Sequence, residues 1–503
     1  MNSRAAPIAN RASESIAARF AADPRAWVLA LCAAQLLLWT ALPRFLSMSL
    51  PLDVVTNGGI PWGNEWQWGY VEHPPLPSWL VAGWFDAAGD TGVFLLSQVA
   101  VVLTYVFVFL LGREIMPAKW AAVGTLLLVG VYYFSVPTPE FDHGIAQLPL
   151  WAAATFFYYK ALQTRRPAWW LALGLAAGLG MLAKYSTGIL LAVVVLHAFS
   201  TARTRQVFRS LGPYLAIAIC IIVLSPHLAW LVRNHFPTID YAVRRAGHES
   251  SFLQRPLVAL RFVLTQLLDV VPALAIAAIG GLIGRDALRR HALDDDGWFL
   301  VALGMGPVLL TALVSLVAGL GLRTMWGVPM CNLSGLLIVW LGRARWPVAS
   351  LKRVAWAVCG VFAAMLIAYA MRASVVPELT GKPSRTQWPD REIAAAFSAA
   401  WTQKTHAPLR IVAGEGWIAG LIAVRAEPRP SIWTNASFAQ SPWITPAELG
   451  ANGALLVRQI TRHGNLAAPV GFQFQGEKDF AWPYEKKAPP LRVAWWVLPP
   501  KTP

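Results

Sequence analysis

Long apolar runs recur from residue 27 to residue 371, and they constrain the fold of this chain more than any other feature. A helix of about 20 apolar residues crosses the hydrocarbon core of a bilayer. We assign membrane spans to residues 27–47, 91–111, 119–136, 144–162, 168–183, 186–200, 213–232, 257–283, 297–320, 326–342 and 353–371. The sequence therefore predicts an all-α polytopic membrane domain, 27–371, with about 11 transmembrane helices.

The charges of the connections between these runs predict the orientation. Alternate connections are basic, namely "GREIMPAK", "KALQTRRP", "TARTRQVFRS", "GRDALRRHALDDD" and "GRARWPVASLKR", and so is the segment 1–26. Lys and Arg accumulate in cytoplasmic loops. We therefore predict that 1–26 is a cytoplasmic N-terminal tail ahead of an uncleaved first span in a multi-pass membrane protein. The remaining connections then face the periplasm, or the equivalent outer side.

The composition changes after Met371. Residues 372–503 contain short strand-like runs, "LRIVAGEG", "GALLVRQI" and "RVAWWVLPP", and a helix-like run, "DREIAAAFSAAWTQ". We predict a small periplasmic α/β domain that caps the membrane domain. The chain has no evident internal repeat, which argues against the transporters that are built from inverted repeats.

The net charge of +16 raises the question of nucleic-acid binding. Basic loops that contact anionic lipid explain this charge, and no nucleic-acid-binding motif accompanies it, so we predict no nucleic-acid partner. The four cysteines fall in or beside apolar runs without metal or redox spacing. They are interpreted as small buried apolar residues.

Two side chains of the first outer connection could carry chemistry. Asp53 follows the first span closely, where a carboxylate can act as general base toward a hydroxyl, although a helix cap or a solvated acid has the same pattern. His73 precedes Pro74 and Pro75 after the Trp-rich "EWQWGYVEH". Its imidazole would face the membrane surface, where an anionic headgroup could sit.

The second outer connection gathers Glu140, Asp142 and His143 at the expected start of a helix. Asp142 could cap that helix while Glu140 interacts with its dipole. The same residues could instead form a polar site or part of a divalent-metal site. Their spacing matches no metal signature, so no metal ligand is assigned and a divalent cation stays an open possibility.

Cations occur in the later outer connections. Lys184 in "MLAKYSTG" could reach to the interface or bind a phosphate. Arg244 and Arg245 could neutralise a phosphate or hold lipid headgroups. Arg323, close to Trp326, repeats the pairing of a cation with an aromatic residue.

Several of these stretches resemble one family. They are "LDVVTNGGIPWGNEWQWGYVEHPPLPSWL", "TPEFDHGIAQLPLW", "GLGMLAKYSTG", "SPHLAWLVRNHFPTIDYA" and "RTMWGVPMCNLSGLLIV". The chain resembles bacterial glycosyltransferase family 39, with the mannosyltransferase-type membrane domain of the GT-C superfamily. That superfamily includes protein O-mannosyltransferases and the lipid A aminoarabinose transferase. The resemblance implies a GT-C fold and transfer of a sugar from polyprenyl phosphate to an acceptor hydroxyl on the outer face.

The resemblance also implies roles for single residues. Asp53 matches the family's base, and His73 and Lys184 match its phosphate-binding positions. The family often has a second acid close behind the first, but Val54, Val55 and Thr56 follow here, which leaves Glu65 or Glu140 as possible partners.

We therefore predict an inner-membrane glycosyltransferase whose acceptor is lipid A, an envelope glycan or a protein. One base suits direct displacement with inversion, since retention by double displacement needs a nucleophilic carboxylate. The alternative is a lipid or solute transporter without bond chemistry. The candidate catalytic residues are Asp53, Glu140 and Asp142. The candidate substrate- or phosphate-binding residues are His73, Lys184, Arg244, Arg245, Arg323, His143 and Glu65.

Overall fold

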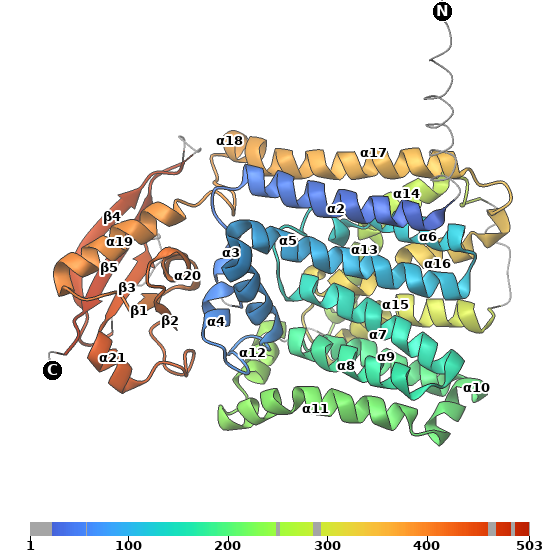
Figure 1. The fold of residues 1–503 in the computed structure, drawn as a ribbon, viewed down its shortest axis with the longest axis horizontal. Coiled ribbons are helices and arrows are strands. Elements are labelled where there is room, and N and C mark those ends of the chain that lie inside the picture. The colour runs from blue at the N-terminus through green and yellow to red at the C-terminus, as the bar shows by residue number, and fades with distance from the viewer. Residues whose placement is uncertain are drawn as a thin grey trace, which may run out of the picture.

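The computed structural model describes residues 23–56, 58–247, 252–284, 293–460, 469–483 and 488–501. It consists of a helical bundle with an α/β unit at one end (Figure 1). Residues 1–22 of the predicted cytoplasmic tail lie outside the described residues.

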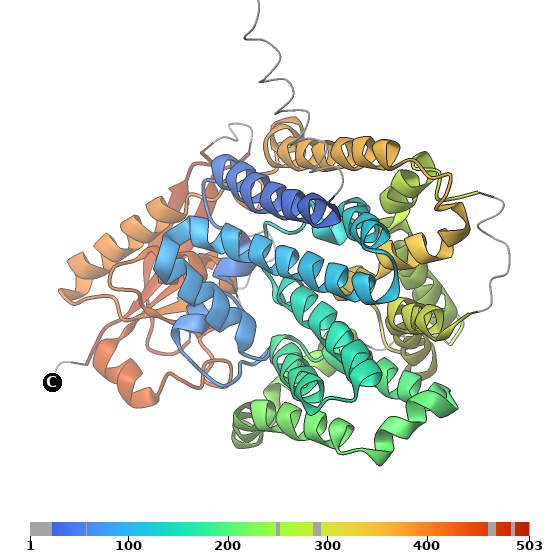
Figure 2. The same ribbon diagram turned by 45° about the vertical axis from the view of Figure 1, so that its right-hand side comes forward.

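The bundle runs from residue 24 to residue 380. Its α-helices are α2 (Pro24–Leu46), α3 (Leu52–Val55), α4 (Ile60–Asn64), α5 (Leu76–Ile115), α6 (Ala118–Leu127), α7 (His143–Thr164), α8 (Pro167–Ala183), α9 (Thr187–Ser200), α10 (Ala202–Arg205), α11 (Gly212–Arg233), α12 (Pro237–Ala246), α13 (Arg255–Asp269), α14 (Val271–Ile279), α15 (Asp295–Ala318), α16 (Ser334–Leu341), α17 (Leu351–Ala370) and α18 (Val376–Thr380). A 3₁₀ segment, Thr324–Cys331, precedes α16, and a π-helical turn, Met371–Val375, follows α17. The first and last long helices, α2 and α17, lie side by side (Figures 1 and 2).

Within the described residues, six helical stretches are long and apolar enough to cross a membrane. They are α2, α5, α11, α13 with α14, α15, and α17 extended through α18. Two bent pairs, α9 with α10 and the Thr324–Cys331 segment with α16, raise the number to as many as eight. Each predicted span coincides with helical structure, but the predicted number of about 11 transmembrane helices is not confirmed.

Helix α5 is longer than its predicted span, 91–111, because the chain stays helical on both sides of a break. Ala88 and Gly89 have non-helical backbone angles, and Gly89 has a φ of +58°. Glycine adopts this left-handed conformation without a Cβ clash. Asp90 lies directly after the break and is available to contacts from the α/β unit.

The α/β unit contains α19 (Asp390–Thr405), α20 (Gly416–Arg425), α21 (Pro446–Asn452) and a five-stranded sheet of order β2-β1-β3-β5-β4. Its strands are β1 (Ile411–Gly414), β2 (Ser431–Thr434), β3 (Ala454–Gln459), β4 (Gln473–Phe480) and β5 (Leu491–Leu498). Strands β2, β1 and β3 are parallel, and β5 and β4 are antiparallel. The three predicted strand runs and the helical run are present, and β2, β4, α20 and α21 were not anticipated.

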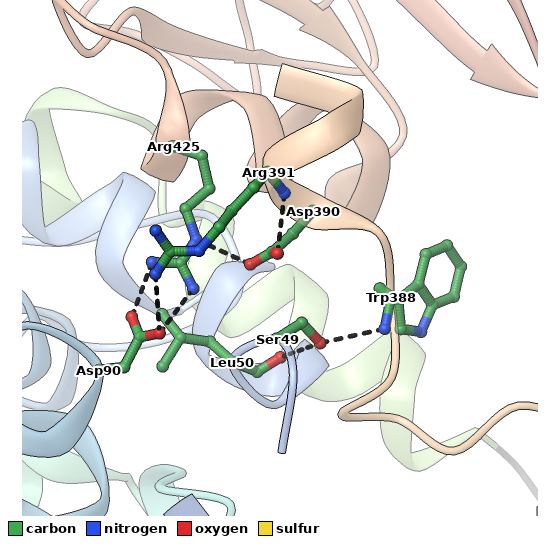
Figure 3. A network of polar contacts seen from close by, with 7 residues as sticks. All are labelled: Ser49, Leu50, Asp90, Trp388, Asp390, Arg391 and Arg425. Atoms are coloured by element: carbon green, nitrogen blue, oxygen red, sulfur yellow. Dashed lines mark hydrogen bonds and ion pairs between the residues drawn. The ribbon is translucent and has the colours of Figure 1, made fainter. Parts of the chain in front are cut away.

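A buried ion cluster joins this unit to the bundle (Figure 3). Arg425 of α20 donates to both oxygens of Asp90, at 2.7 and 3.0 Å, and to Asp390 of α19 at 2.7 Å. The three side chains are no more than 10% exposed. Buried charges need such complete pairing. The α/β unit is therefore packed firmly against the break in α5.

Helix α20 also approaches α3 closely. A Cβ placed on Gly420 would lie 1.8 Å from the carbonyl oxygen of Val55. Only glycine permits this distance between the two backbones. The α/β unit thus packs directly against the short helix that carries Asp53.

Candidate functional site

The predicted base, Asp53, sits in the first turn of α3, a single helical turn that begins after Pro51. Its Oδ1 accepts a 2.6 Å bond from Arg385. Arg385 also contacts Glu140 at 3.1 Å, and Arg372 lies 3.5 Å from Glu140. The guanidinium of Arg385 thus joins two carboxylates from separate connections, and Arg372 contacts only the second of them.

Beside Asp53 lies a cavity of about 480 Å³. Its charged and imidazole side chains come from segments that are far apart in the sequence: Asp53, Glu72, His73, Asp142, His143, Lys184, Arg245 and Arg323. Trp326 and, from α20, Trp417 complete the wall. We call this space the cationic cavity, because it brings together Lys184 and two arginines.

Lys184 and Asp142 form the inner part of this cavity. Lys184 ends α8, and its carbonyl oxygen accepts a 2.9 Å bond from Gln147. Asp142 caps α7 by accepting from the backbone of Ile145 at 2.8 Å. Burial raises the pKa of Asp142 and lowers the pKa of Lys184, and the attraction between the two groups opposes both shifts. Capping and cavity lining are therefore compatible roles for Asp142.

The two histidines of the cavity are in contact. The ring centroids of His73 and His143 are 3.8 Å apart. Burial lowers the pKa of His73 to about 3, with further contributions from Lys184 and Arg245. His73 is consequently neutral near pH 7 and offers hydrogen bonds, while Arg245 and Arg323 bring guanidinium groups to the cavity.

His143 is held against Gly58. A Cβ on Gly58, whose φ is +94°, would lie 2.4 Å from Cε1 of His143, so both the backbone angle and the space require glycine. The Nε2 atom of His143 is buried and has no hydrogen-bond partner among the described residues. Buried polar atoms are normally paired, so this nitrogen is a free contact for a ligand.

A second cavity, of about 360 Å³, adjoins the first and shares Asp53, Asp142 and Met325 with it. Its other polar side chains include Glu140, Asp269, Arg372 and Thr265, with Tyr132 and Tyr133. Burial raises the pKa of Glu140. The positive charge of Arg385 opposes this shift, and repulsion from Asp53 adds to it. We call this space the acidic cavity.

Two predicted binding residues line neither cavity. Glu65 lies between α4 and the sheet, where it accepts from Ser431 at 3.3 Å and where burial raises its pKa to about 7. Arg244 and Arg245 are both exposed on α12, and of the two only Arg245 lines the cationic cavity. Sequence reasoning missed four residues of the site, namely Arg372, Arg385, Tyr241 and Trp417. The polar segment "GKPSRTQWPD", which follows the last helix of the bundle, was the sequence signal that could have indicated Arg385.

The described residues contain no group of three or more His, Cys, Asp or Glu side chains arranged to hold a metal ion. Glu140 forms ion pairs with two arginines, and Asp142 accepts a hydrogen bond from a backbone amide. The divalent cation left open by the sequence therefore has no assigned ligands.

Comparison with known proteins identifies the relatives of this chain. Residues 72–230 match the family model of dolichyl-phosphate-mannose-protein mannosyltransferases. The lipopolysaccharide core galacturonosyltransferase RgtB of Rhizobium johnstonii is 26% identical over 60% of this chain and 63% of its own length. The undecaprenyl phosphate-α-4-amino-4-deoxy-L-arabinose arabinosyl transferase 1 of Pseudomonas fluorescens is 28% identical over 34% of this chain and 32% of its own.

A solved structure extends the comparison to the whole fold. ArnT from Cupriavidus metallidurans, bound to undecaprenyl phosphate, superposes with a TM-score of 0.62 at 15% identity and covers 94% of this chain and 98% of that one. The predicted resemblance to glycosyltransferases is confirmed, because the named relatives are glycosyltransferases. The superposition on ArnT shows a shared fold. The chain spans about three fifths of the length of RgtB.

Proposed function

We propose that this protein transfers a monosaccharide from a polyprenyl-phosphate donor to an acceptor hydroxyl at the periplasmic face of the bacterial inner membrane. The observation that carries the proposal is the convergence of Asp53, Lys184, Arg245 and Arg323 on one cavity of about 480 Å³. These residues supply the base and the positive charges that displacement of a glycosyl phosphate requires.

The reaction follows from these groups. Asp53 takes the proton of the acceptor hydroxyl, through Oδ2, since Arg385 contacts Oδ1. The acceptor oxygen forms a bond to the anomeric carbon as the bond from that carbon to the phosphate oxygen breaks. The electron pair leaves with polyprenyl phosphate, whose negative charge is stabilised by Lys184, Arg245 and Arg323. This single displacement inverts the anomeric carbon.

The two cavities suggest where the substrates bind. An anionic phosphate is attracted to the cationic cavity, while the acidic cavity, with Glu140, Asp269 and two tyrosines, offers acceptors and aromatic rings to a hydroxyl-bearing acceptor. Asp53 lies on the wall that both share. Displacement from the face opposite the leaving group requires such an arrangement.

We also propose where each part of the chain lies relative to the membrane. Residues 27–371 lie in the membrane, 372–503 in the periplasm, and the 1–26 tail in the cytoplasm. Figures 1 and 2 support a common orientation, because α10, part of a basic connection, lies at the end of the bundle farthest from the sheet. The acceptor is lipid A, an envelope glycan or a protein.

The test uses the full-length protein in lipid nanodiscs. Undecaprenyl-phosphate donors carrying galacturonic acid, 4-amino-4-deoxy-arabinose or a neutral hexose are supplied with extracted envelope glycolipids, and products are read by mass spectrometry. We expect one donor to be consumed and one sugar mass to appear on an acceptor. Asp53→Asn should bind undecaprenyl phosphate and lose transfer. Undiminished transfer by Asp53→Asn would refute the base, and movement of intact lipid without sugar transfer would favour a transporter.

A further inference from the structure

Arg385 links the base to a second acid across a long stretch of sequence. It lies 332 residues from Asp53 and contacts Oδ1 at 2.6 Å while its Nε contacts Glu140 at 3.1 Å. The forked guanidinium can hold two carboxylates at once, which a lysine ammonium does less well. The side chains of Arg385 and Asp53 remain partly exposed, at 42% and 44%, so substrates can reach this pair.

The segment around Arg385 is fixed to the chain just before α3. The carbonyl oxygen of Thr386 accepts from the amides of Met48 and Ser49, at 2.9 and 3.0 Å. The amide of Trp388 donates to the hydroxyl of Ser49 at 3.2 Å, a contact visible in Figure 3. Gln387 donates to the carbonyl of Ala373 at 3.0 Å. Arg385 therefore reaches Asp53 from a backbone that is anchored directly after it, at residues 386–388.

Electrostatics explains why a cation is needed at this point. The charged groups that face Asp53 from the elements packed around it are Glu140 and Asp142, Glu72, Lys184, Arg245, Arg323, Arg372 and Arg385. Asp53 raises the pKa of both Glu140 and Asp142 by repulsion. Without Arg385, the base would face these acids with no guanidinium between it and Glu140.

We propose that Arg385 is a positioning residue for catalysis: it holds the Asp53 carboxylate in a fixed orientation and offsets its repulsion from Glu140. The segment that leads into the α/β unit thereby completes the active site. This inference rests on the proposed function, in which Asp53 is the base.

The test compares Arg385→Gln and Arg385→Lys with the wild type in the nanodisc transfer assay. Arg385→Gln should lower kcat by about 100-fold, the size of effect that a displaced catalytic group produces. The KM for the donor should stay near the wild-type value, because the cationic cavity is intact. The acidic limb of the pH–kcat profile should move to higher pH, since two acids now face the base. Arg385→Lys should restore part of kcat and the wild-type pH profile.

Arg429→Gln is the matched control, because Arg429 pairs with Asp86 at 2.5 Å between the α/β unit and α5, away from both cavities. It should leave kcat and the pH profile unchanged. Wild-type kcat, or faster transfer, in Arg385→Gln would overturn the inference. If Arg385→Gln fails to fold, as judged by its melting temperature, Arg385→Lys decides, and a wild-type kcat in that variant also overturns it. Inactivity of the wild type toward every donor would instead defeat the proposed function.

Discussion

His73 and His143 hold their imidazole rings 3.8 Å apart at an interplanar angle of 35°, although they come from different connections. Tyr241 of α12 meets His73 edge-on at 5.7 Å. Two protonated rings at this separation would repel each other, and burial lowers the pKa of both histidines. The chemistry of the cationic cavity thus depends on a histidine that contributes no charge.

This neutrality predicts how stability changes with pH. The pKa of His73 is lowered from 6.5 to about 3, so between these values the unfolded chain binds a proton that the folded chain does not. The folded state should lose stability as the pH falls from 6.5 toward 3, by at most about 1.4 kcal/mol per pH unit from this residue. Melting temperatures at pH 7 and pH 5 should therefore differ less in His73→Asn than in the wild type. His235→Asn, at an exposed histidine, should melt like the wild type at both values; an equal pH effect in His73→Asn would contradict the assignment.

Arg244 and Arg245 provide a matched pair for donor binding. Arg245 lines the cationic cavity, whereas its neighbour on the same helix does not. Arg245→Gln should raise the KM for the polyprenyl-phosphate donor by about tenfold or more, the cost of losing one hydrogen bond to a charged group. Arg244→Gln should leave that KM unchanged. Steady-state kinetics with varied donor measures both, and equal effects would mean that the cavity does not bind the phosphate.

The buried cluster around Arg425 should dominate the attachment of the α/β unit. Arg425→Met leaves Asp90 and Asp390 buried without their cation, which typically costs about 3–5 kcal/mol. The exposed pair of Arg429 with Asp86 should contribute less than about 1 kcal/mol. Thermal unfolding and protease resistance of residues 390–501 distinguish Arg425→Met from Arg429→Gln. A similar loss of stability in both variants would show that burial of the Arg425 cluster does not cause the larger cost.

The contact between α20 and α3 can be tested with one methyl group. A Cβ at Gly420 would meet the carbonyl oxygen of Val55 at 1.8 Å, so Gly420→Ala must separate the two helices. We expect its transfer rate to fall by about 10–100-fold, because α3 carries the base. Gly83→Ala on α5, where the methyl group enters open space, should transfer at the wild-type rate. Full activity in Gly420→Ala would mean that α20 does not position Asp53.

The sequence predicted much of the site because charged residues stand out beside apolar runs. Asp53, His73, Lys184 and Arg323 were found for this reason, and the structure brings them to one cavity. The same pattern could not separate Arg245 from Arg244, since adjacent helical residues point about 100° apart and only the placement of α12 decides which one borders the cavity. Glu65 was also ambiguous, because nothing in its local sequence indicates contact with Ser431 of β2.

The C-terminal residues of the site could not be predicted from the sequence, for a different reason. Arg385 contacts Asp53 and Glu140, which lie far away in the sequence, and no local pattern encodes pairing over such a distance. Strand β4 was missed because its sequence, "QFQGEKDF", is polar and mostly exposed at the sheet edge. The predicted count of about 11 transmembrane helices is not confirmed, and apolar length alone cannot separate bent helical pairs from straight spans.

The 332 residues that separate Asp53 from Arg385 also have a consequence during synthesis. While the ribosome is still extending the bundle, the aspartate is already inserted but its arginine partner does not yet exist. A nascent or prematurely terminated chain would thus lack the contact between Asp53 and Arg385, which can form only after the last long helix and the segment behind it have been synthesised.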